Sequence, residues 1–140
     1  KEDAVAISLK FANQAVGSFL LSDRTPSPWT WEMALGESEK FPKMGMNAIR
    51  FLGTEGALEF PNLVLWRHAE GNGNWHHEIR PEVIDAPFID AYVAQCAHLR
   101  AVTLGLETPI IDALNGSRSL DATLAAARAA TSGTRIKLSM

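Results

Sequence analysis

Apolar and polar residues alternate strictly near the start of the chain. Every second position of residues 4–11 holds a large apolar side chain: Val5, Ile7, Leu9 and Phe11. A period of two predicts a β-strand, because successive side chains of a strand point to opposite faces. Residues 16–22 alternate in the same way after a short segment at 12–15, so the two segments predict a hairpin.

A second hairpin and two further strands are predicted after a long irregular segment. Residues 47–53 and 57–60 flank a short turn, in which Gly56 is expected to supply the positive φ that a tight turn needs. Two more strands are predicted at residues 63–68 and 75–80. A glycine-containing turn at residues 70–74 is expected to join them.

The spacing of apolar residues then changes to three and four, which predicts a helix. Asp85 is the expected cap of this helix, Pro87 a tolerated first-turn residue, and Gly105 lies near its expected end. The helix would carry one stripe at this spacing: Phe88, Tyr92, Cys96 (or Gln95) and Leu99. Such a stripe is typical of the face that a helix buries.

A second helix and a final strand are expected at the end of the chain. Asn115 is the expected N-cap, the helix runs through Thr131, and Gly133 is the expected stop. Residues 134–138 predict a strand. Strands followed by helices are typical of the α+β class. The sequence thus predicts a single domain, residues 1–140, with two helices packed on one face of an open, mainly antiparallel sheet.

The other face of the expected sheet is also apolar. Large apolar residues stand on both sides of the predicted strands: Phe19 and Leu21 oppose Val16 and Leu20, and Ile49 and Phe51 oppose Leu52. Two helices can cover only one face of a sheet, and an uncovered apolar face is an interaction surface. We therefore expect a homodimer that forms sheet to sheet through the open face.

The overall composition narrows the classes of partner. The 140 residues carry a formal net charge of −3, which gives no reason to expect nucleic acid or an anionic membrane as a partner. No apolar run is long enough to span a bilayer, and no signal peptide opens the chain. A single cysteine, Cys96, favours a reducing compartment such as the cytoplasm. Its place on the helix stripe predicts an inert, packed thiol.

The sequence lacks the usual motifs for metal binding, nucleophilic catalysis and dinucleotide binding. His76 and His77 are adjacent, so on a strand they would point to opposite faces. Cys96 and His98 are two apart on a helix, which is also the wrong spacing for one metal ion. No Gly-x-Ser-x-Gly motif occurs, and both glycine-containing turns precede strands rather than a helix N-terminus. No catalytic, metal-binding or cofactor-binding residue is therefore assigned.

The long segment 23–43 is the expected ligand-binding region, because loops of this length in a compact domain are uncommon and often functional. The predicted substrate-binding residues are Asp23, Arg24, Trp29, Trp31 and Glu37, and Glu32 is a further charged residue of the same segment. A sugar-like ligand would stack on tryptophan and form hydrogen bonds with the charged groups. The alternative is that the tryptophans pack the loop onto the sheet and the charges are solvated. A short strand is also expected at 29–33.

Several short segments occur along the chain in a fairly specific order. They are Asp3-Ala4-Val5-Ala6-Ile7, Ala15-Val16-Gly17-Ser18, Gly53-Thr54-Glu55-Gly56-Ala57-Leu58 and the helix–glycine–strand end of the chain. In this order they resemble the C-terminal domain of the glucose–fructose oxidoreductase / inositol dehydrogenase (Gfo/Idh/MocA) family. Residues 27–32, Gly36-Glu37 and Phe41-Pro42 resemble one subgroup, in which Asn-Pro usually stands at the position of Ser38-Glu39.

The resemblance implies a two-domain, NAD(P)-dependent oxidoreductase. Such an enzyme pairs an N-terminal Rossmann domain, which binds NAD or NADP, with a domain of the present kind. The latter forms part of the substrate pocket and commonly the oligomer interface. The implied reaction is hydride transfer at a carbinol or carbonyl carbon of a sugar, polyol or related compound. The Glu-Lys-Pro and Asp-x-x-x-His motifs of the family are absent here and expected before Lys1, so this chain is expected to be inactive alone.

Two other classes of function stay open at the level of sequence. The first is a stand-alone module that holds a carbohydrate or a protein on its sheet face or tryptophan loop. The second is a metal-independent hydrolase that uses Asp23 and Glu37, although no residue spacing supports it. The sequence specifies neither the substrate nor the choice between NAD and NADP.

Overall fold

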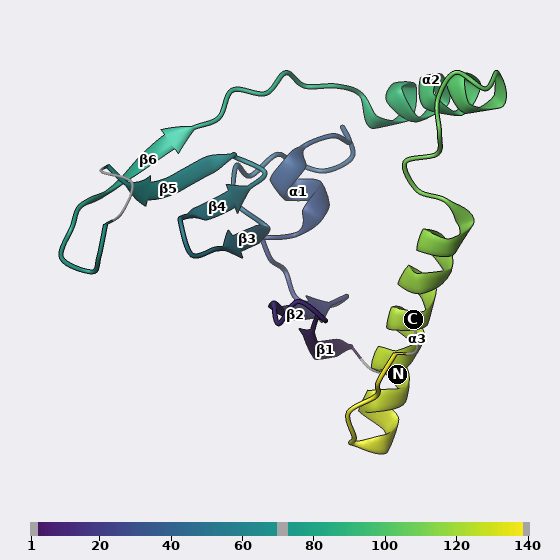
Figure 1. Cartoon of the computed structure of the whole chain (residues 1–140), viewed down its shortest axis with the longest axis horizontal. Coiled ribbons are helices and arrows are strands. Elements are labelled where there is room, and N and C mark those ends of the chain that lie inside the picture. Colours follow the sequence, from purple (N-terminus) through teal and green to yellow (C-terminus); the bar gives the residue numbers. More distant parts are fainter. Residues whose placement is uncertain (1–2, 70–72, 139–140) are drawn as a thin grey trace. The chain divides into compact units, whose positions relative to one another are not determined.

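The structure, a computed structural model, describes residues 3–69 and 73–138 (Figure 1). The chain divides into two compact units, each described here by itself. The hairpin–helix unit comprises Lys1–Arg24 with Ala91–Met140, and the sheet unit comprises Thr25–Asp90. The described residues form an α+β fold with open, antiparallel sheets, as the sequence pattern predicts. The strands divide between a two-stranded and a four-stranded sheet.

The first predicted hairpin is confirmed in the hairpin–helix unit. β1, Ala4–Lys10, pairs antiparallel with β2, Val16–Ser22, along the whole length of both strands. Alternate residues of β1 are half-buried, which matches the period of two in the sequence. An ion pair of 2.8 Å between Arg24 Nη1 and Asp3 Oδ2 ties the two ends of the hairpin together.

α2, Ala91–Thr103, begins later than the sequence predicts. Residues 84–90 have no regular structure, so Asp85 and Pro87 do not begin the helix. All members of the expected stripe are exposed: Phe88, Tyr92, Cys96 and Leu99. The exposed thiol of Cys96 corrects the prediction of a packed residue. The spacing of a stripe defines a helix face, but it does not determine whether another element covers that face.

His98 connects α2 to the segment that follows it. The Ile110 N–H donates to His98 Nε2 over 3.2 Å, and His98 Nδ1 lies 2.7 Å from Glu107 Oε2. The imidazole therefore fixes the connection between the two long helices on both of its nitrogen atoms.

α3, Ala113–Ser132, begins before the predicted N-cap. Asp112 is the cap, because its Oδ1 accepts the backbone N–H of Asn115 over 2.7 Å. Asn115 is thus a residue of the first turn, and the prediction that it caps the helix was wrong. The predicted stop is confirmed, since Gly133 has a φ of 65° and donates its N–H to the carbonyl of Ala129.

The two candidate caps give different mutational effects. Asp112→Ala is expected to lower the free energy of unfolding by about 1 kcal/mol, because the first turn loses the side-chain acceptor of its N–H group. Asn115→Ala is the matched control and should cost less, since alanine retains the backbone N–H that Asp112 binds. Urea unfolding followed by circular dichroism measures both. A larger loss for Asn115→Ala would contradict the assignment of the cap.

Residues 134–138 do not form the predicted final strand. A strand requires a hydrogen-bonded neighbour, and no strand in the described part of the chain pairs with this segment. Thr134 and Ile136 instead lie beside the last turns of α3, where they line a shallow hollow with Ala127 and Thr131. The apolar alternation of this segment was therefore not sufficient to specify a strand.

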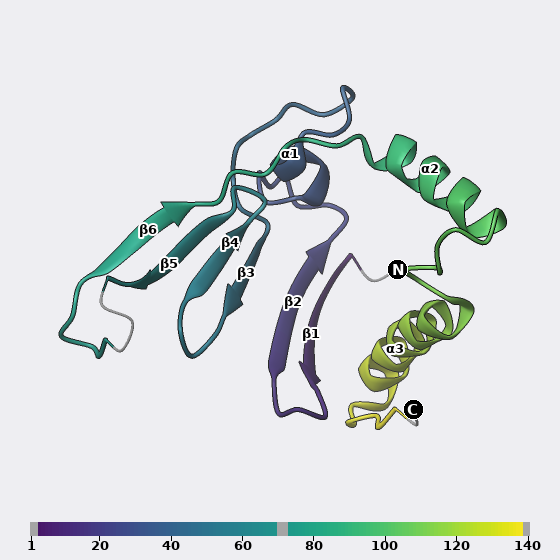
Figure 2. The same cartoon turned by 45° about the horizontal axis from the view of Figure 1, so that its top comes forward.

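The sheet unit contains a four-stranded antiparallel meander (Figure 2). Its strands are β3, Ile49–Leu52; β4, Ala57–Phe60; β5, Val64–His68; and β6, Ile79–Val83. β6 begins later than the strand predicted at 75–80, because the His77 N–H donates to the Asn74 carbonyl over 2.9 Å and closes a turn. The turn predicted at 70–74 lies partly outside the described residues.

A short helix, α1, Trp31–Leu35, replaces the strand predicted at 29–33. Thr30 caps this helix by accepting the Met33 N–H over 3.4 Å, and Gly36 ends it with a φ of 68°. Tryptophan and threonine favour strands. Here the threonine cap and the glycine stop prevail over that propensity.

Gly56 provides space between strands rather than the positive φ that the sequence predicts. Its φ is not among the positive values of the chain, and the Gly53 N–H donates to its carbonyl over 2.8 Å. A Cβ atom at Gly56 would lie 2.7 Å from the backbone oxygen of Trp66 on β5. Glycine is therefore required by the close approach of two backbones.

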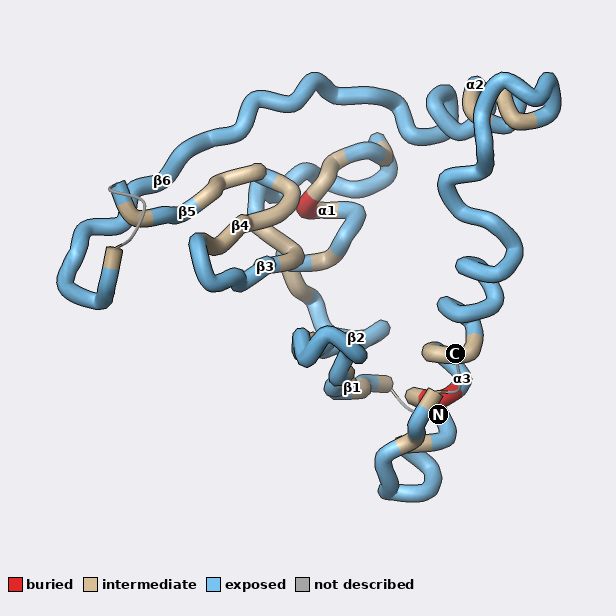
Figure 3. Tube along the Cα trace, in the orientation of Figure 1, coloured by how far each residue is buried: buried red, intermediate tan, exposed pale blue. Residues whose placement is uncertain are grey.

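Few side chains are buried (Figure 3). Among the residues that the structure describes, only Ala34 and Ala125 are buried, with exposed fractions of 0% and 6%. In the sheet unit, the Trp31 ring stacks on Phe60 with 5.5 Å between ring centroids, so α1 lies against one face of the sheet.

No helix in the described ranges is long and apolar enough to cross a membrane.

The two faces of the four-stranded sheet differ in polarity near β5 and β6. A row of apolar side chains crosses all four strands on one face: Leu52, Ala57, Trp66 and Pro81. Val83, on the same face, is 72% exposed. The opposite face carries an ion pair between Arg67 and Glu82. Close to it, a hydrogen bond and the charge of Arg80 lower the pKa of the Glu78 carboxyl.

Candidate functional site

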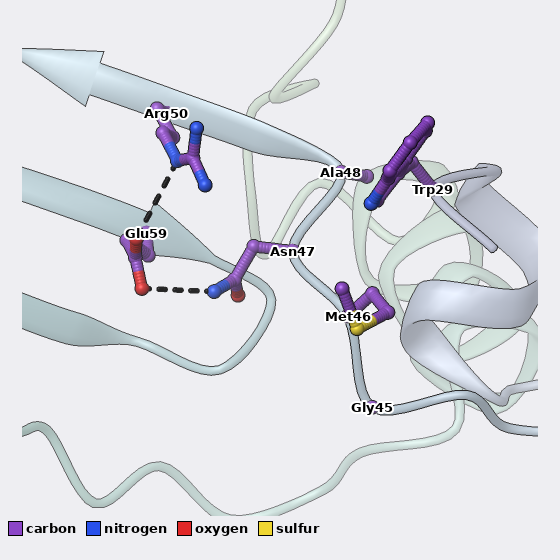
Figure 4. A pocket seen from close by; sticks show the side chains of 7 residues that line it. All are labelled: Trp29, Gly45, Met46, Asn47, Ala48, Arg50 and Glu59. Carbon is purple, nitrogen blue, oxygen red and sulfur yellow. Dashed lines mark hydrogen bonds and ion pairs between the residues drawn. The ribbon is translucent and has the colours of Figure 1, made fainter.

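A hollow of about 470 Å³ lies within the sheet unit (Figure 4). Its lining comes from the loop before α1 and from the β3–β4 hairpin with the segment that leads into it: Trp29, Gly45, Met46, Asn47, Ala48, Arg50 and Glu59. The indole of Trp29 forms one wall and is 60% exposed. The hollow therefore combines an accessible aromatic surface with polar side chains.

Glu59 contacts two other polar side chains that line the hollow. Its Oε2 accepts a hydrogen bond from Asn47 Nδ2 over 2.9 Å, and its Oε1 lies 3.4 Å from Arg50 Nε. Arg50 and Glu59 are opposite each other in the β3–β4 register, so both side chains stand on the same face. The Glu59 side chain is 25% exposed and that of Arg50 is 72% exposed. The carboxylate is thus held from two sides, whereas the guanidinium extends into solvent.

Asn47 and Asn62 fix the segment that carries the floor of the hollow. Asn47 Oδ1 accepts the backbone N–H of Asn62 over 3.1 Å, and Asn62 Nδ2 donates to the Gly45 carbonyl over 2.8 Å. The Ala48 N–H donates to the carbonyl of Phe60 over 2.9 Å. Residues 45–48 are therefore tied to the turn after β4, and Asn47 positions Glu59 through its amide.

This arrangement can bind a small molecule that has one apolar face and several hydroxyl groups. An indole offers a flat surface for stacking, while Arg50 supplies donors and Glu59 supplies acceptors. Pockets of this kind fix the orientation of a ligand with a few convergent polar groups. The hollow is shallow, so it supports binding of one small ring or chain.

The structure places the five predicted substrate-binding residues differently from one another. Trp29 lines the hollow, whereas Trp31 stacks on Phe60, which is the packing role that the sequence left open. Glu37 is exposed beyond the end of α1. Asp23 and Arg24 belong to the hairpin–helix unit. There, the Asp23 backbone N–H donates to the Asp3 carbonyl, and the Arg24 guanidinium donates to the Asp3 carboxylate. Of the five predicted residues, Trp29 is therefore the one that lines the hollow.

Sequence reasoning missed the polar half of the hollow. Arg50 and Glu59 stand at equal distances from the turn that joins β3 and β4, with Leu52 paired to Ala57 between them. A hairpin of this register places the two opposite charges across from each other. The predicted hairpin carries this signal, whereas the predicted ligand-binding region was the long loop together with the nearby strand ends, without Arg50 or Glu59 as named residues.

The described residues do not provide a cradle for a dinucleotide. No glycine-rich loop among residues 3–69 and 73–138 joins a strand to the N-terminus of a helix, and Gly53 and Gly56 flank a turn between two strands. The pyrophosphate of a dinucleotide requires such a loop and helix end.

Histidine residues form a second polar pair in the sheet unit. The His68 and His77 rings meet edge to face with 6.4 Å between centroids, and the buried His68 Nδ1 has no hydrogen-bond partner among residues 3–69 and 73–138. His77 lies in a turn rather than on the predicted strand, so the argument from opposite strand faces does not apply to it. Within the described ranges, no three His, Cys, Asp or Glu side chains gather to hold a metal ion.

Comparison of the chain with protein-family models, with curated proteins and with solved structures finds no match.

Proposed function

We propose that the Trp29 hollow binds a sugar, polyol or related compound, and that the chain is the substrate-binding and oligomerisation domain of an NAD(P)-dependent oxidoreductase. One observation carries the binding proposal: the exposed indole of Trp29 stands beside Glu59, which accepts a hydrogen bond from Asn47 and forms an ion pair with Arg50. The oxidoreductase assignment rests on the sequence resemblance. On this proposal the chain is inactive alone and localises to the cytoplasm.

The residues of the hollow have distinct roles in the proposed binding. Trp29 stacks on the apolar face of the ligand, and the terminal nitrogens of Arg50 donate to hydroxyl oxygens. Glu59 accepts hydrogen bonds from hydroxyl groups, while Asn47 is a positioning residue that holds this carboxylate. A Rossmann domain would supply the nicotinamide cofactor, and its choice between NAD and NADP would not depend on these residues.

A stand-alone binding module is the second candidate function. It is favoured by the fact that the hollow is built entirely within the sheet unit and requires no other domain. The two functions share the ligand and differ in chemistry. Coding DNA upstream of Lys1 separates them: an open frame with Gly-x-Gly-x-x-Gly and Glu-Lys-Pro supports the oxidoreductase, and a start codon directly before Lys1 supports the module.

Isothermal titration of the chain with neutral monosaccharides and cyclic polyols tests the binding proposal. We expect saturable binding with a dissociation constant of about 1 mM, which corresponds to about 4 kcal/mol and suits a shallow site. No saturable binding by any member of the panel, at concentrations well above this value, would refute the proposed function in both of its forms.

We also propose that one face of the four-stranded sheet, the face that carries Leu52, Ala57, Trp66 and Pro81, forms the interface of a homodimer. Leu52 is 82% exposed on this face, and Arg50 and Glu59 stand on it too, so the interface would border the hollow. Exposed apolar rows of this kind are stabilised by burial against a partner. The same face would serve the oligomer of either candidate function.

A charge at Leu52 is expected to weaken this dimer. Leu52→Lys should raise the dimer dissociation constant at least about tenfold, because a desolvated ammonium would stand in an apolar interface. Phe51→Lys is the matched control: the residue is 55% exposed, adjacent in sequence and on the opposite face. Sedimentation velocity measures both variants. A wild-type protein that is monomeric at high micromolar concentration would contradict the interface.

A further inference from the structure

The hollow presents a positive and a negative group at nearly the same place. Arg50 Nε is 3.4 Å from Glu59 Oε1, and the two residues are cross-strand partners on one face of the sheet. Figure 4 shows the guanidinium and the carboxylate side by side at one end of the hollow, with Trp29 at the other. Any ligand that stacks on the indole and reaches this end therefore meets both charges.

We propose that the Arg50–Glu59 pair selects an uncharged ligand with two neighbouring hydroxyl groups over the same ligand carrying a carboxylate or phosphate. This inference rests on the proposed function and specifies its substrate class. Its basis is the hydrogen-bonding capacity that the pair retains after its internal contacts are formed.

Both members of the pair keep free capacity. An ionised carboxylate accepts about four hydrogen bonds, whereas Glu59 accepts one from Asn47 and forms an ion pair with Arg50. A guanidinium has about five N–H donors, and Arg50 directs only its Nε toward Glu59. Its terminal nitrogens extend from Nε toward the side of the hollow on which Ala48 and Trp29 lie (Figure 4).

A vicinal diol matches this pair in both directions. One hydroxyl oxygen can accept from a terminal nitrogen of Arg50, and the neighbouring hydroxyl can donate to Glu59. Both contacts are assisted by a charge on the protein, and neither requires a charge on the ligand. The ring that carries the diol then extends toward Trp29, where its apolar face is covered by the indole.

An acidic ligand gains little from the same pair. The attraction of Arg50 for an anion and the repulsion by Glu59 act over similar distances and have opposite signs, so they nearly cancel. The acidic ligand also loses part of its own hydration when it enters the hollow. The balance therefore favours the uncharged compound.

Titration of the chain with two matched pairs of ligands tests this selectivity. The pairs are glucose with glucuronate and glucose with glucose 6-phosphate, each followed by isothermal titration. We expect the wild-type protein to bind glucose at least about tenfold more tightly than either acid. Glu59→Gln retains the shape of the side chain but leaves Arg50 without a compensating charge, so the preference should shift toward the acids.

Glu78→Gln is the matched control for this variant. Glu78 is paired with Arg80 in the same unit but does not line the hollow, so its substitution should leave the preference unchanged. A wild-type protein that prefers an acid would overturn the inference while the proposed function stands. An unchanged preference in Glu59→Gln would also overturn it. Binding of none of the three compounds would overturn the inference, whereas the proposed function falls only if the whole panel of monosaccharides and polyols fails to bind.

Discussion

Trp29→Ala is expected to weaken the binding of a neutral sugar or polyol about tenfold or more, which corresponds to at least about 1.4 kcal/mol. The indole is the only large aromatic surface among the residues that line the hollow, and it is 60% exposed and thus accessible to a ligand. Alanine removes the stacking surface and leaves the hydrogen-bonding groups in place. Isothermal titration with the sugar that the wild-type protein binds best measures the loss.

Trp75→Ala is the matched control for this substitution. Trp75 belongs to the same unit, is fully exposed at 100% and does not line the hollow, so the variant removes an identical side chain without a change at the site. Its affinity should equal that of the wild type. Equal affinities of all three proteins would show that Trp29 does not contact the ligand and would reject the hollow as the site.

Gly56→Ala is expected to lower the free energy of unfolding by about 2 kcal/mol, a typical cost of forcing an extra methyl group into a packed position. The added Cβ would lie 2.7 Å from the backbone oxygen of Trp66, so β4 and β5 would have to move apart. Because this neighbour is backbone rather than a flexible side chain, it cannot rotate away. Chemical denaturation followed by tryptophan fluorescence measures the loss.

Gly53→Ala controls for the general effect of alanine in the same turn. A Cβ at Gly53 would meet only the carbonyl oxygen of Gly56, at 3.4 Å, and the backbone of Gly53 does not have a positive φ. This variant should be close to the wild type in stability. Equal losses for both variants would indicate that the turn, and not the approach of β4 to β5, requires glycine.

The strands were predicted well where the sequence alone determines them. Residues 4–11 and 16–22 alternate over a whole strand length, and β1 and β2 lie within these ranges. Helix starts were predicted less well, because several residues near each start can cap it. Asp112 and Asn115 are both good caps, and the choice depended on which side chain reaches a free N–H group. Strand pairing of residues 134–138 required a neighbour that the local pattern does not specify.

The candidate site was predicted in part. Trp29 was identified because a long loop with aromatic residues is a frequent location of ligand sites. Trp31 was identified for the same reason, but its ring stacks on Phe60, and composition does not distinguish a packing tryptophan from a binding one. Arg50 and Glu59 were missed because they are nine positions apart in the sequence. Only the register of the β3–β4 hairpin places the two side chains opposite each other.

The most direct test of the central claim is a nuclear magnetic resonance titration of the isotope-labelled chain with the neutral sugars and polyols. The resonances of the Trp29 indole N–H and the Asn47 side-chain amide should shift together and saturate with one dissociation constant. The chemical shift of the Trp75 indole N–H should not change. Shifts confined to residues outside the hollow, or no shift at all, would contradict the claim that this hollow binds the ligand.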